Sequence, residues 1–151
     1  MADLPKPQSW LAVQAMVACM QQIRSADGYR TDAGANVTDE PAQVPDDGTP
    51  IVLAVVLDTR SRPTDPGAPR TAKSASIALL VKLSCGITDA QQVLHEVLDD
   101  IDKAIDGKAI AFPENITYPR FASSQQIPAA DGVNWIGAEI RYDCTYWPLK
   151  R

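Results

Sequence analysis

Residues 51–57 form the sequence feature that most constrains the fold of this chain: the apolar run IVLAVVL. The run is rich in β-branched residues and is bounded by Pro50 and Asp58. An unbroken run of this kind is typical of a strand that lies centrally or is covered on both faces. Such a strand needs neighbouring strands and a covering layer, so the chain must fold around a sheet.

Two further strands follow from alternating patterns. In residues 74–83 the apolar Ile77, Leu79, Val81 and Leu83 alternate with smaller or polar residues, which predicts a neighbouring strand with one core face. Residues 136–146 alternate in the same way. We also expect a short, proline-interrupted edge strand within residues 112–121, because proline is tolerated where no ladder donor is needed. The segment between the first two strands, TRSRPTDPGAPRTAK at 59–73, holds three prolines and four cations and is expected to project as a long hairpin arm.

Two segments have helical spacing. Residues 9–26 place Val13, Met16, Val17, Met20 and Ile23 on one stripe, and residues 88–107 do the same with Leu94, Val97, Leu98, Ile101 and Ile105. Thr88 and Gln91 have capping-box spacing at the start of the second helix. These elements predict one α+β domain over residues 1–151, with two main helices packed on a mixed or mostly antiparallel sheet of about four to five strands.

Charge and composition exclude several classes of protein. The net charge is −5 and the isoelectric point about 4.7, which argues against direct nucleic-acid binding. No apolar run is long enough to span a bilayer, and the N-terminus lacks a secretory pattern, so we expect a protein made in the cytoplasm with no membrane partner. The three cysteines lack metal-site or disulfide spacing and are expected to stay reduced.

The sequence offers few candidates for catalysis. The single histidine, His95, lies ten residues after Cys85, and a solvated histidine on a helix surface is the simpler interpretation. An acidic cluster in 39–47 lacks calcium-loop spacing. No common nucleotide, hydrolase or zinc-protease motif is present. We therefore predict a non-enzymatic protein without metal or cofactor, and a small cytosolic enzyme with an unrecognised carboxylate site stays as the alternative.

Trp135 and Trp147 bracket the last strand on the side opposite its apolar set. Large aromatics in this position favour a partner surface, since tryptophan is enriched in interface cores. Packing beneath a proline-rich loop is the alternative interpretation.

The segment IRSADGYRTDAGANV, residues 23–37, joins the first helix to the sheet. Gly28 and Gly34 can adopt tight or left-handed conformations, and Thr31 and Asp32 can bond to their own backbone in a turn. Tyr29 can pack beside them. We interpret Gly28, Tyr29, Thr31, Asp32 and Gly34 as a structural corner.

A helix running into this corner, followed by a polar insertion and PIVLAVVL, resembles the tail terminator and minor tail proteins of long-tailed bacteriophages, the tail-completion group of the lambda minor tail protein U type. The motif covers roughly residues 10–57, and the remainder agrees in element order. The resemblance implies an α+β subunit that assembles as a ring, usually a hexamer, on the tail tube. It implies partners in the tail tube protein and the head–tail connector, and a location in the virion tail after assembly in the host cytoplasm.

The chain departs from compact members of that group in the arm and in the insertion at 38–49. These departures suggest a hypothesis about the ring, in which cations of the arm reach acidic residues on the second helix of the next subunit. The cations are Arg60, Arg62, Arg70 and Lys73, and the acids are Asp99, Asp102 and Asp106. A head–tail connector or a tail-tube subunit stays as a second interpretation, because both share small α+β architecture.

Overall fold

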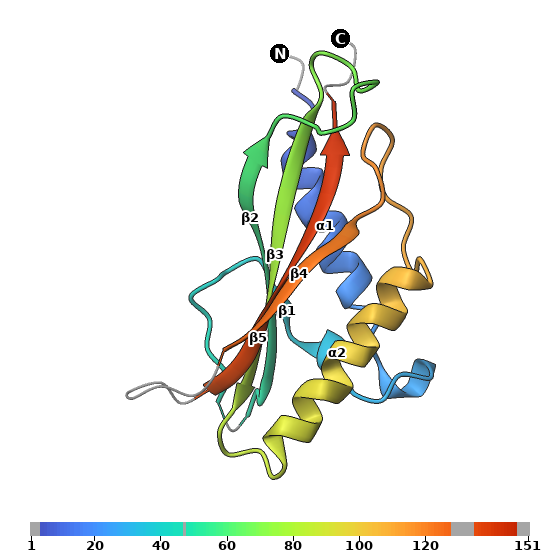
Figure 1. The fold of residues 1–151 in the computed structure, drawn as a ribbon. Helices are drawn as coiled ribbons and strands as arrows, with labels where there is room; N and C mark the ends of the chain where they lie inside the picture. Colours follow the sequence, from blue (N-terminus) through green and yellow to red (C-terminus); the bar gives the residue numbers. More distant parts are fainter. Residues whose placement is uncertain (1–3, 47, 128–134, 148–151) are drawn as a thin grey trace.

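The computed structural model describes residues 4–46, 48–127 and 135–147 (Figure 1). The described residues form two α-helices and five strands. The helices are α1 (Gln8–Met20) and α2 (Ala90–Asp106). The strands are β1 (Val37–Thr38), β2 (Ile51–Ser61), β3 (Lys73–Ser84), β4 (Arg120–Ile127) and β5 (Trp135–Tyr146). Two short 3-10 turns, η1 (Ser25–Asp27) and η2 (Ala33–Ala35), lie between α1 and β1.

The strands form one mixed sheet in the order β1-β2-β3-β5-β4. β1 is parallel to β2, and the remaining pairs are antiparallel. β2 and β3 are neighbours, as the sequence predicts, and the alternating segment near the C-terminus forms β5. The predicted α+β class, with two helices and a mixed sheet, is therefore confirmed.

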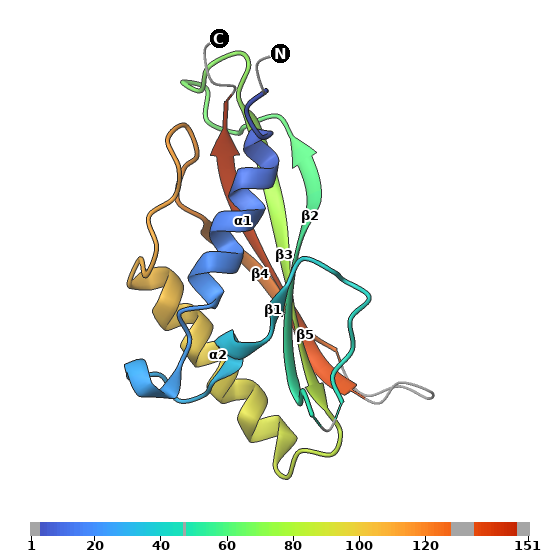
Figure 2. The same ribbon diagram turned by 180° about the vertical axis from the view of Figure 1, so that it is seen from behind.

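Both helices cover the same face of the sheet (Figures 1 and 2). Alternate residues of β3, among them Ile77, Leu79 and Val81, join Met16 of α1 and Ile101 of α2 in one buried cluster. The alternation works because successive strand side chains point to opposite faces, so one set meets the helices. Burial of these side chains supplies the main driving force for the fold.

The second face of β2 is also covered, although neither of the two described helices lies there. Val52 and Ala54 point away from the helices and are nevertheless fully buried. The loop at 39–50 lies over them and is held by Lys82 of β3, whose ammonium group donates to the carbonyls of Pro41 at 2.5 Å and Gln43 at 2.9 Å. Coverage on both faces explains why residues 52–55 are apolar without alternation.

The structure corrects one predicted boundary of each helix: the end of α1 and the start of α2. α1 ends at Met20, not near residue 26, and the chain continues through η1. The capping box predicted for Thr88 and Gln91 is not formed, because α2 begins at Ala90 with Asp89 as its N-cap in a left-handed conformation at φ 57°. Asp89 thus occupies the N-cap position that the prediction gave to Thr88, and no side chain makes a capping hydrogen bond there.

Two strand predictions also need correction. The predicted edge strand within 112–121 is wrong for most of its length: Ile116 makes an isolated bridge to Tyr146, and the true edge strand, β4, begins only at Arg120. The long arm at 59–73 is not confirmed, because β2 and β3 pair out to Ser61 and Ser74. The two ends of the predicted arm belong to β2 and β3, so residues 62–72 alone form the connection between these strands.

Candidate functional site

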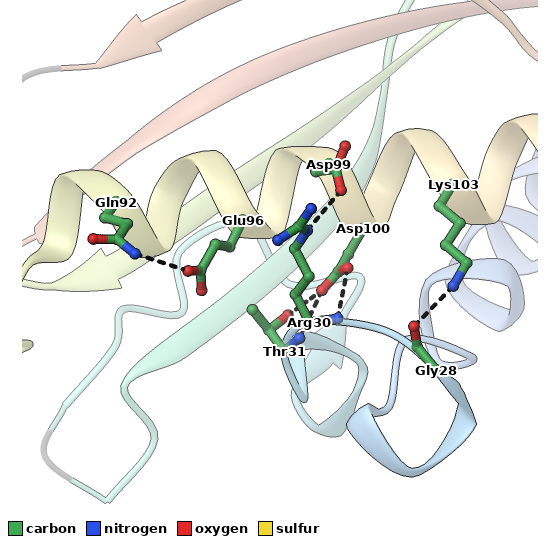
Figure 3. A network of polar contacts seen from close by, with 8 residues as sticks. All are labelled: Gly28, Arg30, Thr31, Gln92, Glu96, Asp99, Asp100 and Lys103. Carbon is green, nitrogen blue, oxygen red and sulfur yellow. Dashed lines mark hydrogen bonds and ion pairs between the residues drawn. The ribbon is translucent and has the colours of Figure 1, made fainter.

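The corner after α1 is fixed by a buried carboxylate on α2 (Figure 3). Asp100 is 1% exposed. One of its oxygens accepts the backbone N–H of Arg30 at 2.9 Å, and the other accepts the backbone N–H of Thr31 at 2.8 Å and its hydroxyl at 2.7 Å. Three donors therefore surround a carboxylate that has almost no access to water. This contact ties the corner to the middle of α2.

The two glycines of the corner are required for different reasons: Gly28 by its backbone conformation and Gly34 by lack of space. Gly28 has φ +92° and ends η1, and its carbonyl accepts a hydrogen bond from Lys103 at 2.8 Å. A Cβ at Gly34 would lie 2.7 Å from the carbonyl oxygens of both Met20 and Ile23. The Gly34 N–H donates to that Ile23 carbonyl at 2.9 Å, so the corner closes against the last turn of α1.

Two more side chains complete the corner. Asp32 accepts hydrogen bonds from the backbone N–H and the hydroxyl of Ser25, at 2.8 Å and 2.9 Å, and these bonds hold the pKa of Asp32 below its usual value. The ring of Tyr29 lies beneath the Lys103 ammonium group, 4.7 Å from the ring centroid. The polar groups of the corner are thus occupied by contacts within the chain, which is what a structural element requires.

Sequence reasoning missed Asp100 as the partner of the corner. The signal was present in the spacing, since Asp100 lies three residues after Val97 and four before Ala104, and both of these are buried. A carboxylate on the buried stripe of a helix needs donors from elsewhere in the fold. The sequence cannot say which donors, because Arg30 and Thr31 are about seventy residues away along the chain.

The four cations of the predicted arm gather around one surface hollow of about 570 Å³ at the β2–β3 end of the sheet. Arg60 donates to the hydroxyl of Tyr146 at 3.4 Å, and the Lys73 ammonium group donates to the carbonyl of Thr71. Arg62 and Arg70 line the same hollow and are exposed. Among the described residues that line this hollow, none is an aspartate or a glutamate.

The three acids of the hypothesis lie on the exposed side of α2. Asp99 pairs with Arg30 within the chain, Nε to Oδ2 at 2.9 Å. Partial desolvation raises the pKa of Asp102, and the neighbouring charges of Asp106 and Asp99 raise it further. The negative charges of these three aspartates therefore repel one another within a single subunit. A positively charged partner would reduce that repulsion.

The two tryptophans predicted as a partner surface, Trp135 and Trp147, are both half-buried but have different surroundings. Trp135 lies beneath the ammonium group of Lys82, 5.3 Å from the ring centroid, next to the loop at 39–50. Trp147 lines a hollow of about 830 Å³ together with Pro63 and Pro69 of the β2–β3 connection. The indole ring of each of these tryptophans thus lies beside a loop of its own chain.

The two edges of the sheet carry exposed apolar side chains. β4 is exposed along almost its whole length, and its Phe121 is 60% exposed. At the opposite edge, Leu57 of β2 is 38% exposed and Trp10 of α1 is 39% exposed. These two residues line an apolar groove of about 270 Å³ between α1 and the free edge of β2, with Val13 at its floor.

The weaker catalytic candidates, His95 and Cys85, are both exposed. His95 contacts Gln91 on the surface of α2 at 3.2 Å, and Cys85 is exposed before that helix. Among the described residues no group of three or more metal-ligating side chains comes together; Asp47 of the acidic cluster lies outside them. Neither described helix is long and apolar enough to cross a membrane.

No protein-family model matches this chain, and no curated protein matches it.

Proposed function

We propose that this protein is a structural subunit of a long-tailed bacteriophage that assembles as a ring on the tail tube. The ring ends polymerisation of the tube and presents a surface for joining the head. Its partners are further copies of itself, the tail tube protein and the head–tail connector, and its place is the virion tail, after assembly in the host cytoplasm. The starting point is the resemblance of residues 10–57 to tail terminator proteins, and no bond is made or broken in this role.

One observation carries the proposal: the exposed apolar side chains Phe121, Leu57 and Trp10 lie at the two edges of a sheet whose edges are open. Open strand edges with apolar neighbours are surfaces for pairing with another chain. A subunit with one such surface at each side supports head-to-tail contacts, which generate closed rings or open filaments. The polar residues of the corner, by contrast, are already used inside the fold.

The mass of the purified chain in solution tests this proposal. We expect light scattering coupled to size exclusion to give one discrete assembly whose size does not grow with concentration, and negative-stain images to show rings. Continuous growth with concentration would favour a tube subunit instead. A chain that stays monomeric at every concentration, and gains stability from a metal ion or small substrate, would favour the enzyme alternative.

The charge hypothesis for the ring has a separate test. Arg62 and Arg70 are exposed and make no described hydrogen bond, so reversing both to glutamate leaves the fold of the subunit intact. If the arm meets the acids of the next copy, the double variant weakens the ring, and the weakening becomes smaller at high salt. Native mass spectrometry that finds unchanged rings at low salt would remove the idea.

A further inference from the structure

The two open edges of the sheet lie at the same level. Phe121 of β4 is opposite Tyr142 of β5, Tyr142 is opposite Ile77 of β3, and Ile77 is opposite Leu57 of β2. Phe121 and Leu57 therefore lie at the same level on the two opposite edges of the sheet. By the same steps, residues 120–124 of β4 lie level with residues 55–59 of β2.

The two edges also present their apolar groups on the same face. The Phe121 ring stacks edge-on against Tyr142, with centroids 6.1 Å apart, and Tyr142 belongs to the core beneath the helices. Leu57 lies opposite Ile77, another core residue, and borders the groove beside Trp10 of α1. A groove of about 270 Å³ is large enough for a phenyl ring, since a cavity of about 150 Å³ binds benzene.

Strand direction permits the two edges to join. β2 is antiparallel to β3, β3 to β5, and β5 to β4, so β4 runs opposite to β2 within one copy. A second copy moved sideways along the sheet brings its β2 antiparallel to the first copy's β4. Its helices then lie on the same face as those of the first copy. The combined sheet is continuous, and its right-handed twist turns each copy relative to the last.

Both edges have backbone groups free for this pairing. β1 pairs with β2 only at Leu53 and Ala54, so no described strand lies beside residues 55–61 of β2. The outer edge of β4 likewise has no neighbouring strand in the described chain. Natural edge strands are usually protected by charge or by proline, but residues 121–127 of β4 carry neither.

We infer that residues 120–124 of one copy add, antiparallel, to residues 55–59 of the next copy, with Phe121 inserted into the groove beside Trp10 and Leu57. The inference rests on the proposed function, because it names the surface through which the ring forms. The contact is heterologous: β4 of each copy meets β2 of the next. Main-chain hydrogen bonds fix the alignment of the copies, and the buried phenyl ring supplies an apolar anchor.

Cross-linking tests the geometry directly. The register also places Ser123 of β4 level with Val56 of β2, so these two positions can be cross-linked while Phe121 and Leu57 stay in place. In a Cys85→Ser background, the variant carrying Val56→Cys and Ser123→Cys is oxidised and separated on a non-reducing gel. Within one copy these positions are three strand spacings apart, about 14 Å, which is too far for a disulfide. We expect a ladder of covalent multimers up to the ring size. Each single variant should give no ladder; a dimer from Ser123→Cys alone would indicate β4–β4 pairing and overturn the inference.

A surface variant tests the anchor. We expect Phe121→Glu to raise the concentration at which the ring dissociates by at least about tenfold, because a charge cannot enter the apolar groove. Val44→Glu is the matched control, since Val44 is 56% exposed and belongs neither to the lining of the groove nor to β4. Circular dichroism confirms that each variant is folded.

The outcomes separate the two proposals. If the wild-type chain forms rings, but the double-cysteine variant gives no ladder and Phe121→Glu leaves the rings unchanged, the edge pairing is overturned and the ring proposal stands. A wild-type chain that never assembles would overturn both.

Discussion

Replacing Asp100 with asparagine is the sharpest perturbation of the fold that the structure offers. The change keeps the size of the side chain and converts one carboxylate oxygen into an amino group. Asp100 accepts from two backbone N–H groups and one hydroxyl, using both oxygens. In asparagine, whichever way the amide is turned, an NH₂ group faces at least one of those N–H donors.

The cost follows from these contacts. A buried donor left without an acceptor costs about 1–3 kcal/mol, and the remaining bonds lose the strength that a charged acceptor gives them. We therefore expect Asp100→Asn to lower the free energy of unfolding by about 2–4 kcal/mol. For a chain of 151 residues this corresponds to a fall in Tm of about 5–15 °C.

Asp99→Asn provides the control. It makes the same isosteric change one residue earlier in α2 and removes the same charge, but Asp99 is exposed and its one ion pair, to Arg30, is with a solvated guanidinium. Exposed pairs of this kind contribute little to stability. Urea unfolding followed by circular dichroism compares the two variants, and we expect a much smaller change for Asp99→Asn.

A double-mutant cycle that combines Thr31→Val with Asp100→Asn isolates the hydrogen bond from the Thr31 hydroxyl to Asp100. Removing that hydroxyl should cost clearly more in the wild type than in Asp100→Asn, because the variant has already weakened its acceptor. Equal stability losses for Asp99→Asn and Asp100→Asn, or no coupling with Thr31, would refute the assignment of Asp100 as the anchor of the corner.

Three further predictions follow. Gly137→Ala should prevent stable folding, judged by circular dichroism and solubility, because its Cβ would lie 1.8 Å from the carbonyl oxygen of Val81; Gly48→Ala should be tolerated, because its Cβ would come no closer than 3.5 Å to the Asp46 carboxylate. Lys82→Met should keep the sheet but release the loop at 39–50, seen as faster proteolysis there, since Lys82 is 4% exposed and holds that loop by two hydrogen bonds. Burial raises the pKa of Cys144 to about 11, from 9.0, so the unfolded thiol ionises first: its contribution to stability is complete below about pH 9 and is lost towards pH 11. Unfolding free energies measured by urea titration should therefore fall less steeply over that range in Cys144→Ala than in the wild type, and a parallel decline would contradict the prediction.

Local pattern predicted the elements that contact the core. The two helices and strands β3 and β5 show a repeating apolar residue, because each contacts the core on one side. The helix-facing residues of β3 follow this rule throughout. Strand β2 shows an unbroken apolar run instead, because both of its faces are covered. Element ends were less well predicted, as at α1, where the helix stops at Met20 although Ile23 continues the apolar spacing and is buried.

β4 was missed for the converse reason. Its residues, RFASSQQI, are exposed on both faces except at the last position, so no alternation marks them. Its strand conformation comes from pairing with β5, which the local sequence does not encode. The same absence of pattern makes this strand an open edge, and the candidate assembly surface was therefore the part of the sheet that the sequence could least predict.

The sequence by itself determined the class of fold and the positions of the buried helix and strand segments, since burial on one face leaves a periodic apolar pattern and burial on both faces leaves an unbroken apolar run. It also marked the corner at 28–34 through its glycines and short polar residues. Only the tertiary structure decided that Asp100 holds this corner, that Lys82 holds the covering loop, and that Phe121 and Leu57 lie level at opposite edges. These facts depend on contacts between residues distant in the chain, and a polar or exposed residue leaves no periodic trace of the partner it will meet.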